Sequence, residues 1–448
     1  MTMTPQEFLD SAAMSARQRL VVGIVCLAML AHGLDLASAS FVYPELVRLE
    51  HASMGTVTLT VTAGVLALAL AGAVAGPLAD RFGRKGVAIV GITVFGLATA
   101  AMGLVPSIGA FVGFRLLACL GLGAMVPAVL TIVADTTPAA RRASMVSLVW
   151  CGAAGGYIAG SFLASAVLPA WGWRALLVLC GLPPLLLVPV VAWLVPESAS
   201  VLVARGHTPE RIREVLARLS PGRDLSVVDL APPVRGQRRW AGAEVLSRRF
   251  LNATLLIWFC SFVGLGVVFL IANYLPLLID RNGYGTAQTG VLVGLFGICG
   301  LAGQLLVSAA LRRFDARAVL AVLWLVGIAG VAVAGVVRLS PAAFLVVVLL
   351  LGLSLGGANA ILPALAAITY PAAVRATGMS WANGVGQLGP VIGGLAGGMM
   401  IGAGWPTATI FLVLAVPVLA GIVATLVLLA GSRRQRVREA AAAELAAR

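Results

Sequence analysis

The chain has 448 residues, of which 60% are hydrophobic and only 11% are charged, and its mean hydropathy is +1.02. A soluble protein of this length needs far more charged surface, so this composition excludes a soluble fold and indicates a protein that crosses a membrane many times. The formal net charge of +14 suggests nucleic acid as a partner only if the basic residues cluster on a soluble surface.

A helix needs about 20 apolar residues to cross the hydrocarbon core of a bilayer. Twelve stretches meet this requirement, so we predict an all-α membrane protein with twelve transmembrane helices. Their continuous apolar character excludes a β-barrel, whose strands alternate. The first stretch lacks a suitable cleavage site, and we expect it to be retained rather than removed as a signal peptide. The predicted spans are 20–40, 56–78, 87–105, 108–133, 143–168, 174–195, 250–279, 287–311, 317–337, 341–366, 376–401 and 405–430.

Basic residues gather on one side of the predicted membrane. They occupy the N-terminus, the C-terminal tail and the loops that follow even-numbered spans, whereas the opposite loops carry only Arg48, Arg174, Arg281 and Arg338. This is the positive-inside pattern, which places both termini in the cytoplasm. The distribution explains the net charge, so we expect no nucleic acid among the partners.

The sequence shows no chemistry of an enzyme. All six cysteines fall within predicted spans without C-x-x-C spacing, so we expect packed thiols and no metal site. A nucleotide-binding G-x-x-x-x-G-K-[ST] motif and a paired acid–base set are also absent from the sequence. We therefore expect neither catalysis nor a cofactor.

One polar stretch, 196–249, separates six spans from six. Within it, "GHTPERIREVLARLS" predicts a helix with Thr208 as N-cap and Pro209 at the first position. The rest of the stretch is typical of a flexible linker, and the basic tail is either a surface helix held by anionic lipid or a solvated segment. The apolar face of the predicted linker helix consists of Ile212, Val215, Leu216 and Leu219. The predicted organisation is an N-terminus at 1–19, a bundle at 20–195, a linker at 196–249, a second bundle at 250–430 and a tail at 431–448.

The two halves repeat each other. Setting Arg142 on Arg375 in "RRASMVSLVWCGAAGGYIAGSFLA" and "VRATGMSWANGVGQLGPVIGGLAGG" also places Gly156 on Gly389 and Gly160 on Gly393. Parallel repeats of six helices indicate a transporter whose two bundles rock about a site near the middle of the membrane. We expect the shared glycines to allow close helix contact.

The stretch "GPLADRFGRKG", residues 76–86, resembles the loop signature of the major facilitator superfamily, G-x-x-x-D-R-x-G-R-[RK]. Asp80 is suited to meet a helix N-terminus or an arginine when the cytoplasmic side is shut, and Arg81, Arg84 and Lys85 to anchor the loop in the interface. The matching stretch of the second half, "SAALRRFDAR", has Arg312 where the acid belongs. The complete set of one acid and three basic residues is therefore present only in the loop of the first half.

Further gating residues follow at the cytoplasmic ends of other spans. Asp135 ends the fourth span, and we expect it to join the gate with Arg141 or Arg142. Arg375 is the counterpart of Arg142 in the second half.

Several other stretches carry a more specific resemblance. "FRLLACLGLGAMVP" places Arg115 in the superfamily's R-x-x-x-G-x-G pattern, and "VPES" closes the sixth span. Together with "HGLDL", "NYLPLLIDRNGY" and "VRATGMSWANGVGQLG", they resemble the aromatic acid:proton symporters over nearly the whole chain. That family carries benzoate, hydroxybenzoates, protocatechuate and related acids into bacteria. The resemblance implies two pseudo-symmetric six-helix bundles, uptake of an organic acid with protons across the bacterial inner membrane, and a monomer.

The sequence departs from these patterns in two spans. The family's first span carries D-G-[FY]-D, but here His32 replaces the first acid and Leu34 the aromatic residue, so only Asp35 remains. In the fifth span, the antiporter signature G-x-x-x-G-P-x-x-G-G is broken by Tyr157 and Ser161. The second departure weighs against drug efflux.

Asp35, Arg115 and His32 are the ionisable residues expected deep in the membrane, where a charge costs about 2.5–3.5 kcal/mol and therefore faces a cavity or a partner. The functional interpretation gives Asp35 the proton, shared with His32, and Arg115 the substrate carboxylate. The structural alternative is a permanent Asp35–Arg115 ion pair that only holds two helices together.

Polar and aromatic residues of the second half are candidates for the pocket that holds an aromatic ring. Each alone is equally typical of contacts between helices. These candidates are Asn273, Tyr274, Gln304, Asn359, Trp381, Asn383 and Gln387.

Two other functions remain open besides proton-coupled uptake of aromatic or other small organic acids. One is a major facilitator carrier for another substrate class: a sugar acid, an aliphatic carboxylate, or a drug exchanged for protons. The other is a membrane receptor that binds without transporting.

Overall fold

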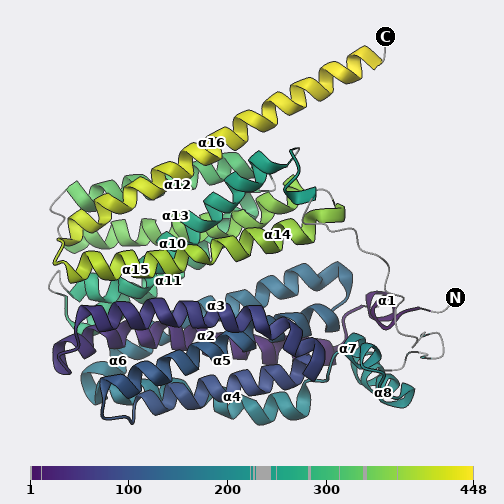
Figure 1. Cartoon of the computed structure of the whole chain (residues 1–448), viewed down its shortest axis with the longest axis horizontal. Coiled ribbons are helices and arrows are strands. Elements are labelled where there is room, and N and C mark those ends of the chain that lie inside the picture. Colours follow the sequence, from purple (N-terminus) through teal and green to yellow (C-terminus); the bar gives the residue numbers. More distant parts are fainter. Residues whose placement is uncertain are drawn as a thin grey trace. The chain divides into compact units, whose positions relative to one another are not determined.

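The structure is a computed structural model. It describes residues 3–446 apart from 12, 222, 224, 226–227, 229–243, 249, 281–283, 312, 337–340 and 371. The side chains of Asp80, Asn359 and Arg375 also lie outside the described part. The chain divides into two compact units, residues 1–236 with 284–294 and residues 237–283 with 295–448, and Figure 1 shows their helices.

Long apolar helices form the first unit, and each of them includes a predicted span. The longest, α6, contains both the fifth and the sixth predicted spans. The helical geometry is interrupted at Gly172, and this kink separates the two spans. The φ of 75° at this residue lies in the left-handed region, which glycine adopts readily because it has no Cβ. The helices are α2 (Ala16–Leu49), α3 (Met54–Phe82), α4 (Arg84–Met102), α5 (Ile108–Thr136) and α6 (Ala139–Leu194).

The predicted eleventh span is confirmed by an apolar helical stretch at Trp381–Gly402 that is long enough to cross a membrane, although the helix is interrupted within it. The break lies at Gln387, between α14 and α15. Pro390 explains its position, since proline has no N–H to donate to the carbonyl of Gly386 and its ring crowds that carbonyl. The later helices are α10 (Leu251–Asp280), α11 (Thr286–Ala310), α12 (Ala316–Val336), α13 (Pro341–Thr369), α14 (Ala372–Gly386), α15 (Leu388–Gly402) and α16 (Thr407–Ala446).

The described helices account for the twelve predicted spans. Within the described residues, nine helices are long and apolar enough to cross a membrane, and α6 is long enough to do so twice. Shorter apolar stretches at Ala318–Val333 and Leu345–Ala358, in α12 and α13, supply the remaining two.

In the first unit, α2 and α6 approach each other through glycines. A Cβ at Gly156 would collide with the carbonyl oxygen of Leu30, and a Cβ at Gly33 would collide with the carbonyl oxygen of Ala153. Such close approach lets the two backbones pack without intervening side chains.

The second unit repeats this contact between α10 and α15. A Cβ at Gly389 would meet the carbonyl oxygen of Phe262, and Gly266 lies against the backbone of Gly389. The correspondence that sets Gly156 on Gly389 also sets Gly33 on Gly266. The repeat seen in the sequence is therefore a repeat of one helix–helix contact.

We expect Gly156→Ala to lower the thermal stability of the purified protein, because its methyl group forces α2 and α6 apart. Overpacking of this kind costs about 1–3 kcal/mol. Gly155→Ala is the matched control, since nothing lies within 4 Å of a Cβ at the neighbouring glycine. Equal melting temperatures of the two variants in detergent would show that the close contact is not required.

Three short helices gather at one end of the first unit (Figure 1): α1 (Pro5–Asp10), α7 (Ala199–Ala204) and α8 (Pro209–Leu219). The predicted linker helix is confirmed as α8, which starts at Pro209 after Thr208, although Thr208 makes no side-chain capping bond. Helices α1 and α7 were not predicted. They join α8 in a small apolar core that contains Phe8, Leu9, Leu202, Ile212, Leu216 and Leu219.

Candidate functional site

A buried ion pair joins three helices of the first unit. Arg115 from α5 donates a hydrogen bond of 2.7 Å to Oδ2 of Asp35 in α2, and Thr99 from α4 donates one of 2.7 Å to Oδ1. Asp35 is 0% exposed and Arg115 is 5% exposed. Each carboxylate oxygen therefore has a donor, and each charge is compensated within the apolar interior.

Helix positions place this pair away from the loop at 76–86. Thr99 lies in the last turn of α4, and Arg115 lies within the first three turns of α5. The pair therefore belongs to the half of the unit that contains the α4–α5 connection. Asp35 and Arg115, predicted as membrane-buried residues that need a partner, are brought together.

Two further side chains of α2 belong to this cluster. His32 lies one turn before Asp35, and its Nδ1 is buried without a hydrogen-bond partner among the described residues. Tyr43 is buried, and its hydroxyl interacts with Arg115. Tyr43 was not predicted, although its i+8 spacing from Asp35 indicates that both residues face the same side of a helix. Thr99 was not predicted either, because a neutral hydroxyl in an apolar span gives no signal.

In the second unit, two predicted pocket residues of α10 bind backbone atoms. The Asn273 side chain donates a 3.0 Å hydrogen bond to the carbonyl of Phe269, one turn earlier in the same helix. The Tyr274 hydroxyl donates a 2.9 Å hydrogen bond to the carbonyl of Gly394 in α15. Tyr274 therefore links two helices.

The remaining candidates are spread over α11, α13 and α14 and the break after α14. Trp381 in α14 packs against Trp258 in α10, with ring centroids 6.0 Å apart. Gln304 in α11 is partly buried, as is Gln387 at the break between α14 and α15, whereas Asn383 is exposed. Asn359 and Arg375 fall on side chains outside the described part, so their predicted roles stay predictions.

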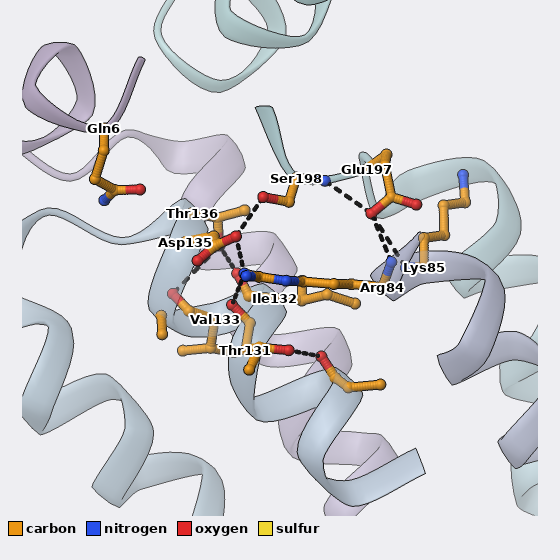
Figure 2. A network of polar contacts seen from close by, with 12 residues as sticks. Gln6, Arg84, Lys85, Thr131, Ile132, Val133, Asp135, Thr136, Glu197 and Ser198 are labelled. Atoms are coloured by element: carbon orange, nitrogen blue, oxygen red, sulfur yellow. Dashed lines mark hydrogen bonds and ion pairs between the residues drawn. The ribbon is translucent and has the colours of Figure 1, made fainter. Parts of the chain in front are cut away.

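A second polar cluster lies at the ends of α4, α5 and α6, and Figure 2 shows it from close by. The Arg84 guanidinium forms an ion pair with Asp135, and the Ser198 hydroxyl donates to the same carboxylate. Arg84 also donates to the carbonyl of Thr131 at 3.3 Å. The start of α4 is thus tied to the last turns of α5 and to the segment after α6.

Glu197 completes this cluster from the "VPES" segment. Its Oε1 accepts hydrogen bonds from the backbone N–H groups of Arg84 at 3.0 Å and Lys85 at 3.3 Å. The carboxylate thereby satisfies donors at the N-terminus of α4 and interacts with its dipole. Glycine is favoured at position 83, because φ is 96° there and a Cβ would collide with Oε2 of Glu197. This role was not predicted, although the sequence shows an acid just after the sixth span.

The predicted partners of Asp135 are wrong. Asp135 pairs with Arg84, while Arg142 pairs with Asp10 of α1 at 2.7 Å and donates from Nε to the carbonyl of Ala134 at 2.8 Å. The reason is the packing of α1, because Asp10 also accepts from the backbone of Ala139 at the start of α6. Sequence alone gave no sign that the N-terminus reaches this point.

The predicted role of the loop bases also changes. Arg84 binds Asp135, and Lys85 donates a 2.5 Å hydrogen bond to the carbonyl of Ala192 in α6. Both hold helices of one unit together instead of only lying in the interface. Arg81 lies over the ring of the exposed Phe82, with 5.3 Å to its centroid, as expected for an interfacial side chain.

We expect Glu197→Gln to destabilise the first unit by about 1–2 kcal/mol, because a neutral amide binds the N-terminal N–H groups of α4 more weakly than a carboxylate does. The melting temperature of the purified protein measures this loss. Glu214→Gln is the control, since Glu214 forms an exposed pair with Arg218, and such pairs contribute little. A Glu197→Gln variant as stable as this control would contradict the capping role.

The fold and the buried pair define a multi-pass membrane carrier built from repeated helices. The model of the Major Facilitator Superfamily matches residues 25–393 and again 286–447, so the chain belongs to this superfamily and is a transporter, not an enzyme.

Its relatives cover nearly the whole chain. The 4-hydroxybenzoate transporter PcaK of Pseudomonas aeruginosa is 32% identical over 95% of this chain and 95% of its own length. The gallate transporter of Pseudomonas putida is 31% identical over 94% of each chain. The partially occluded inward-open structure of the xylose transporter XylE from Escherichia coli superposes with a TM-score of 0.69 at 16% identity, covering 92% of this chain and 97% of that one. The likeness to XylE shows the fold alone.

Proposed function

We propose that this protein carries aromatic acids into a bacterial cell together with protons, as a monomer in the inner membrane with both termini in the cytoplasm. The buried Asp35–Arg115 pair carries the proposal, because it provides one proton-accepting group and one carboxylate-binding group in contact. The relatives named for transport of 4-hydroxybenzoate and gallate support the substrate class.

The chemistry of the pair suggests how the two cargoes are coupled. Without substrate, Asp35 neutralises Arg115 across 2.7 Å. A substrate carboxylate that binds Arg115 replaces Asp35 as its partner, and the separated Asp35 is stabilised by protonation in its apolar surroundings. His32, whose Nδ1 is buried without a partner in the described structure, is placed to share this proton.

The aromatic ring of the substrate needs an apolar pocket with a few polar contacts. We assign the polar contacts to the second-half residues Asn273, Gln304, Asn359, Asn383 and Gln387. Trp381 would supply an aromatic face for the ring. The structural contact of Tyr274 with Gly394 favours a packing role for this residue instead.

The cluster around Arg84, Asp135 and Glu197 lies within one unit, and we propose that it keeps this unit rigid while the transporter changes conformation. A unit that moves as a body needs such bonds between the ends of its helices, since alternating access in this class is largely rigid-body rocking. Asp80 and Arg375 stay assigned to the gate by sequence alone.

The proposal is tested by uptake into proteoliposomes. We expect radiolabelled 4-hydroxybenzoate to accumulate when the outside is acidic, and the accumulation to collapse when a protonophore removes the pH gradient. Uptake of a sugar acid or an aliphatic carboxylate, but not of 4-hydroxybenzoate, would instead assign the other substrate class. Equal uptake with and without the gradient would contradict proton coupling.

A further inference from the structure

A pocket of about 660 Å³ lies in the first unit, apart from the Asp35–Arg115 pair. Its walls come from the linker segment with α7 and α8 and from the ends of α2, α4 and α6. Arg17 and Lys85 lie at the starts of α2 and α4, and Arg205, Arg211 and Arg218 lie in the linker segment. The pocket therefore lies where the apolar spans give way to the polar linker.

Positive charge dominates the wall of this pocket. Both carboxylates among the described lining residues are engaged: Glu197 accepts backbone N–H groups of α4, and Glu214 pairs with Arg218 at 2.6 Å. On α8, Arg211, Glu214 and Arg218 follow one another at three- and four-residue steps, so they form one stripe along the helix. The cations on the wall are Arg17, Lys85, Arg205, Arg211 and Arg218.

Large apolar side chains complete the rim. Trp193, next to the last residue of α6, is 79% exposed, and Phe82, the last residue of α3, is 58% exposed. Exposed apolar residues on spanning helices face lipid, and tryptophan prefers the level of the headgroups. The pocket thus combines a basic wall with a rim suited to acyl chains.

We propose that this pocket binds the phosphate headgroup of an anionic phospholipid. Guanidinium groups bind phosphate oxygens with two parallel hydrogen bonds, and basic pockets on the cytoplasmic side of membrane proteins suit anionic headgroups. A water-soluble phosphate ester offers the same oxygens. Trp193 and Phe82 favour the lipid, because a soluble ester leaves them uncovered.

Native mass spectrometry of the full-length protein in detergent tests the proposal with phosphatidylglycerol as the probe. We expect phosphatidylglycerol to bind at least tenfold more tightly than phosphatidylcholine. Each neutralised cation near an anionic headgroup weakens binding about fivefold, so Arg205→Gln with Arg211→Gln should weaken it about thirtyfold. Arg213→Gln is the matched control, because Arg213 is exposed on the same helix but does not line the pocket.

A second measurement does not depend on the variants. In nanodiscs of wild-type protein, residues 199–219 should exchange amide hydrogens more slowly in phosphatidylglycerol than in phosphatidylcholine. Addition of glycerol phosphate, the soluble headgroup, should not reproduce this protection. If glycerol phosphate reproduces the protection, the lipid assignment is overturned. Equal exchange under all conditions would overturn the site. Equal lipid affinity of the double variant and the Arg213→Gln control would overturn it as well.

Discussion

Asp35→Asn is expected to abolish the accumulation of aromatic acid that a pH gradient drives. The amide cannot take up or release a proton, so movement of substrate is no longer linked to the gradient. Exchange of labelled for unlabelled substrate across the proteoliposome membrane should persist, because the neutral side chain resembles the protonated carrier. Accumulation at the wild-type level would rule out Asp35 as the proton carrier.

The buried pair allows a second explanation for a loss of accumulation, and the experiment must distinguish it from a loss of proton coupling. If Asp35 only pairs with Arg115, its replacement leaves a buried cation without a counter-charge, which costs about 3–5 kcal/mol. Melting temperature, substrate binding and exchange would then fall together. Preserved exchange in a stable variant supports proton coupling, whereas joint loss supports the structural pair.

Glu45→Gln is the matched control for this experiment. Glu45 lies on the same helix and also pairs with an arginine, Arg48, at 2.8 Å, but the side chain of that arginine is 61% exposed. Water therefore compensates the charge of Arg48 when the carboxylate is lost. We expect gradient-driven accumulation by this variant to match the wild type.

Arg115→Lys is expected to weaken the binding of aromatic acids by about ten- to a hundredfold. A guanidinium holds a carboxylate with two parallel hydrogen bonds, whereas an ammonium on a shorter side chain offers a point charge in a different place. The loss of one charge-assisted contact is worth about 1.5–3 kcal/mol. Calorimetric titration of the purified protein with 4-hydroxybenzoate measures the change.

A neutral analogue separates binding from folding in this variant. The methyl ester of 4-hydroxybenzoate has the same ring but no carboxylate, so its affinity should change little. Equal losses for the acid and the ester would indicate that Arg115 only supports the helices. Arg48→Lys, which alters an exposed arginine that bonds the carboxylate of Glu45, should change neither affinity.

Much of the fold could be predicted from the sequence. The length of the apolar stretches predicted the spans, since a helix that crosses a bilayer must satisfy its backbone hydrogen bonds internally and present about 20 apolar residues. The helix at Pro209–Leu219 was predicted by its local start signal and its apolar face. The repeat of Gly156 and Gly389 was predicted from the sequence, and its physical cause is the close approach of α6 to α2 and of α15 to α10.

The partner of a charged side chain could be predicted only where few oppositely charged residues lie within reach. A buried carboxylate in an apolar span needs a cation, and Arg115 was the arginine predicted deep in the membrane, so it was the natural partner of Asp35. At the helix ends, several acids and bases compete within reach of one another. There Asp135 forms an ion pair with Arg84, and Asp10 forms one with Arg142.

The tertiary structure decided these contacts because they join segments that are far apart in the chain. Glu197 meets the start of α4 across more than a hundred residues, and Thr99 reaches Asp35 from another helix. The pocket beside α8 exists only because α7 and α8 fold back onto the ends of the spans. Hydropathy and helix signals are local properties of the chain, whereas the choice among competing polar partners depends on the packing of whole helices.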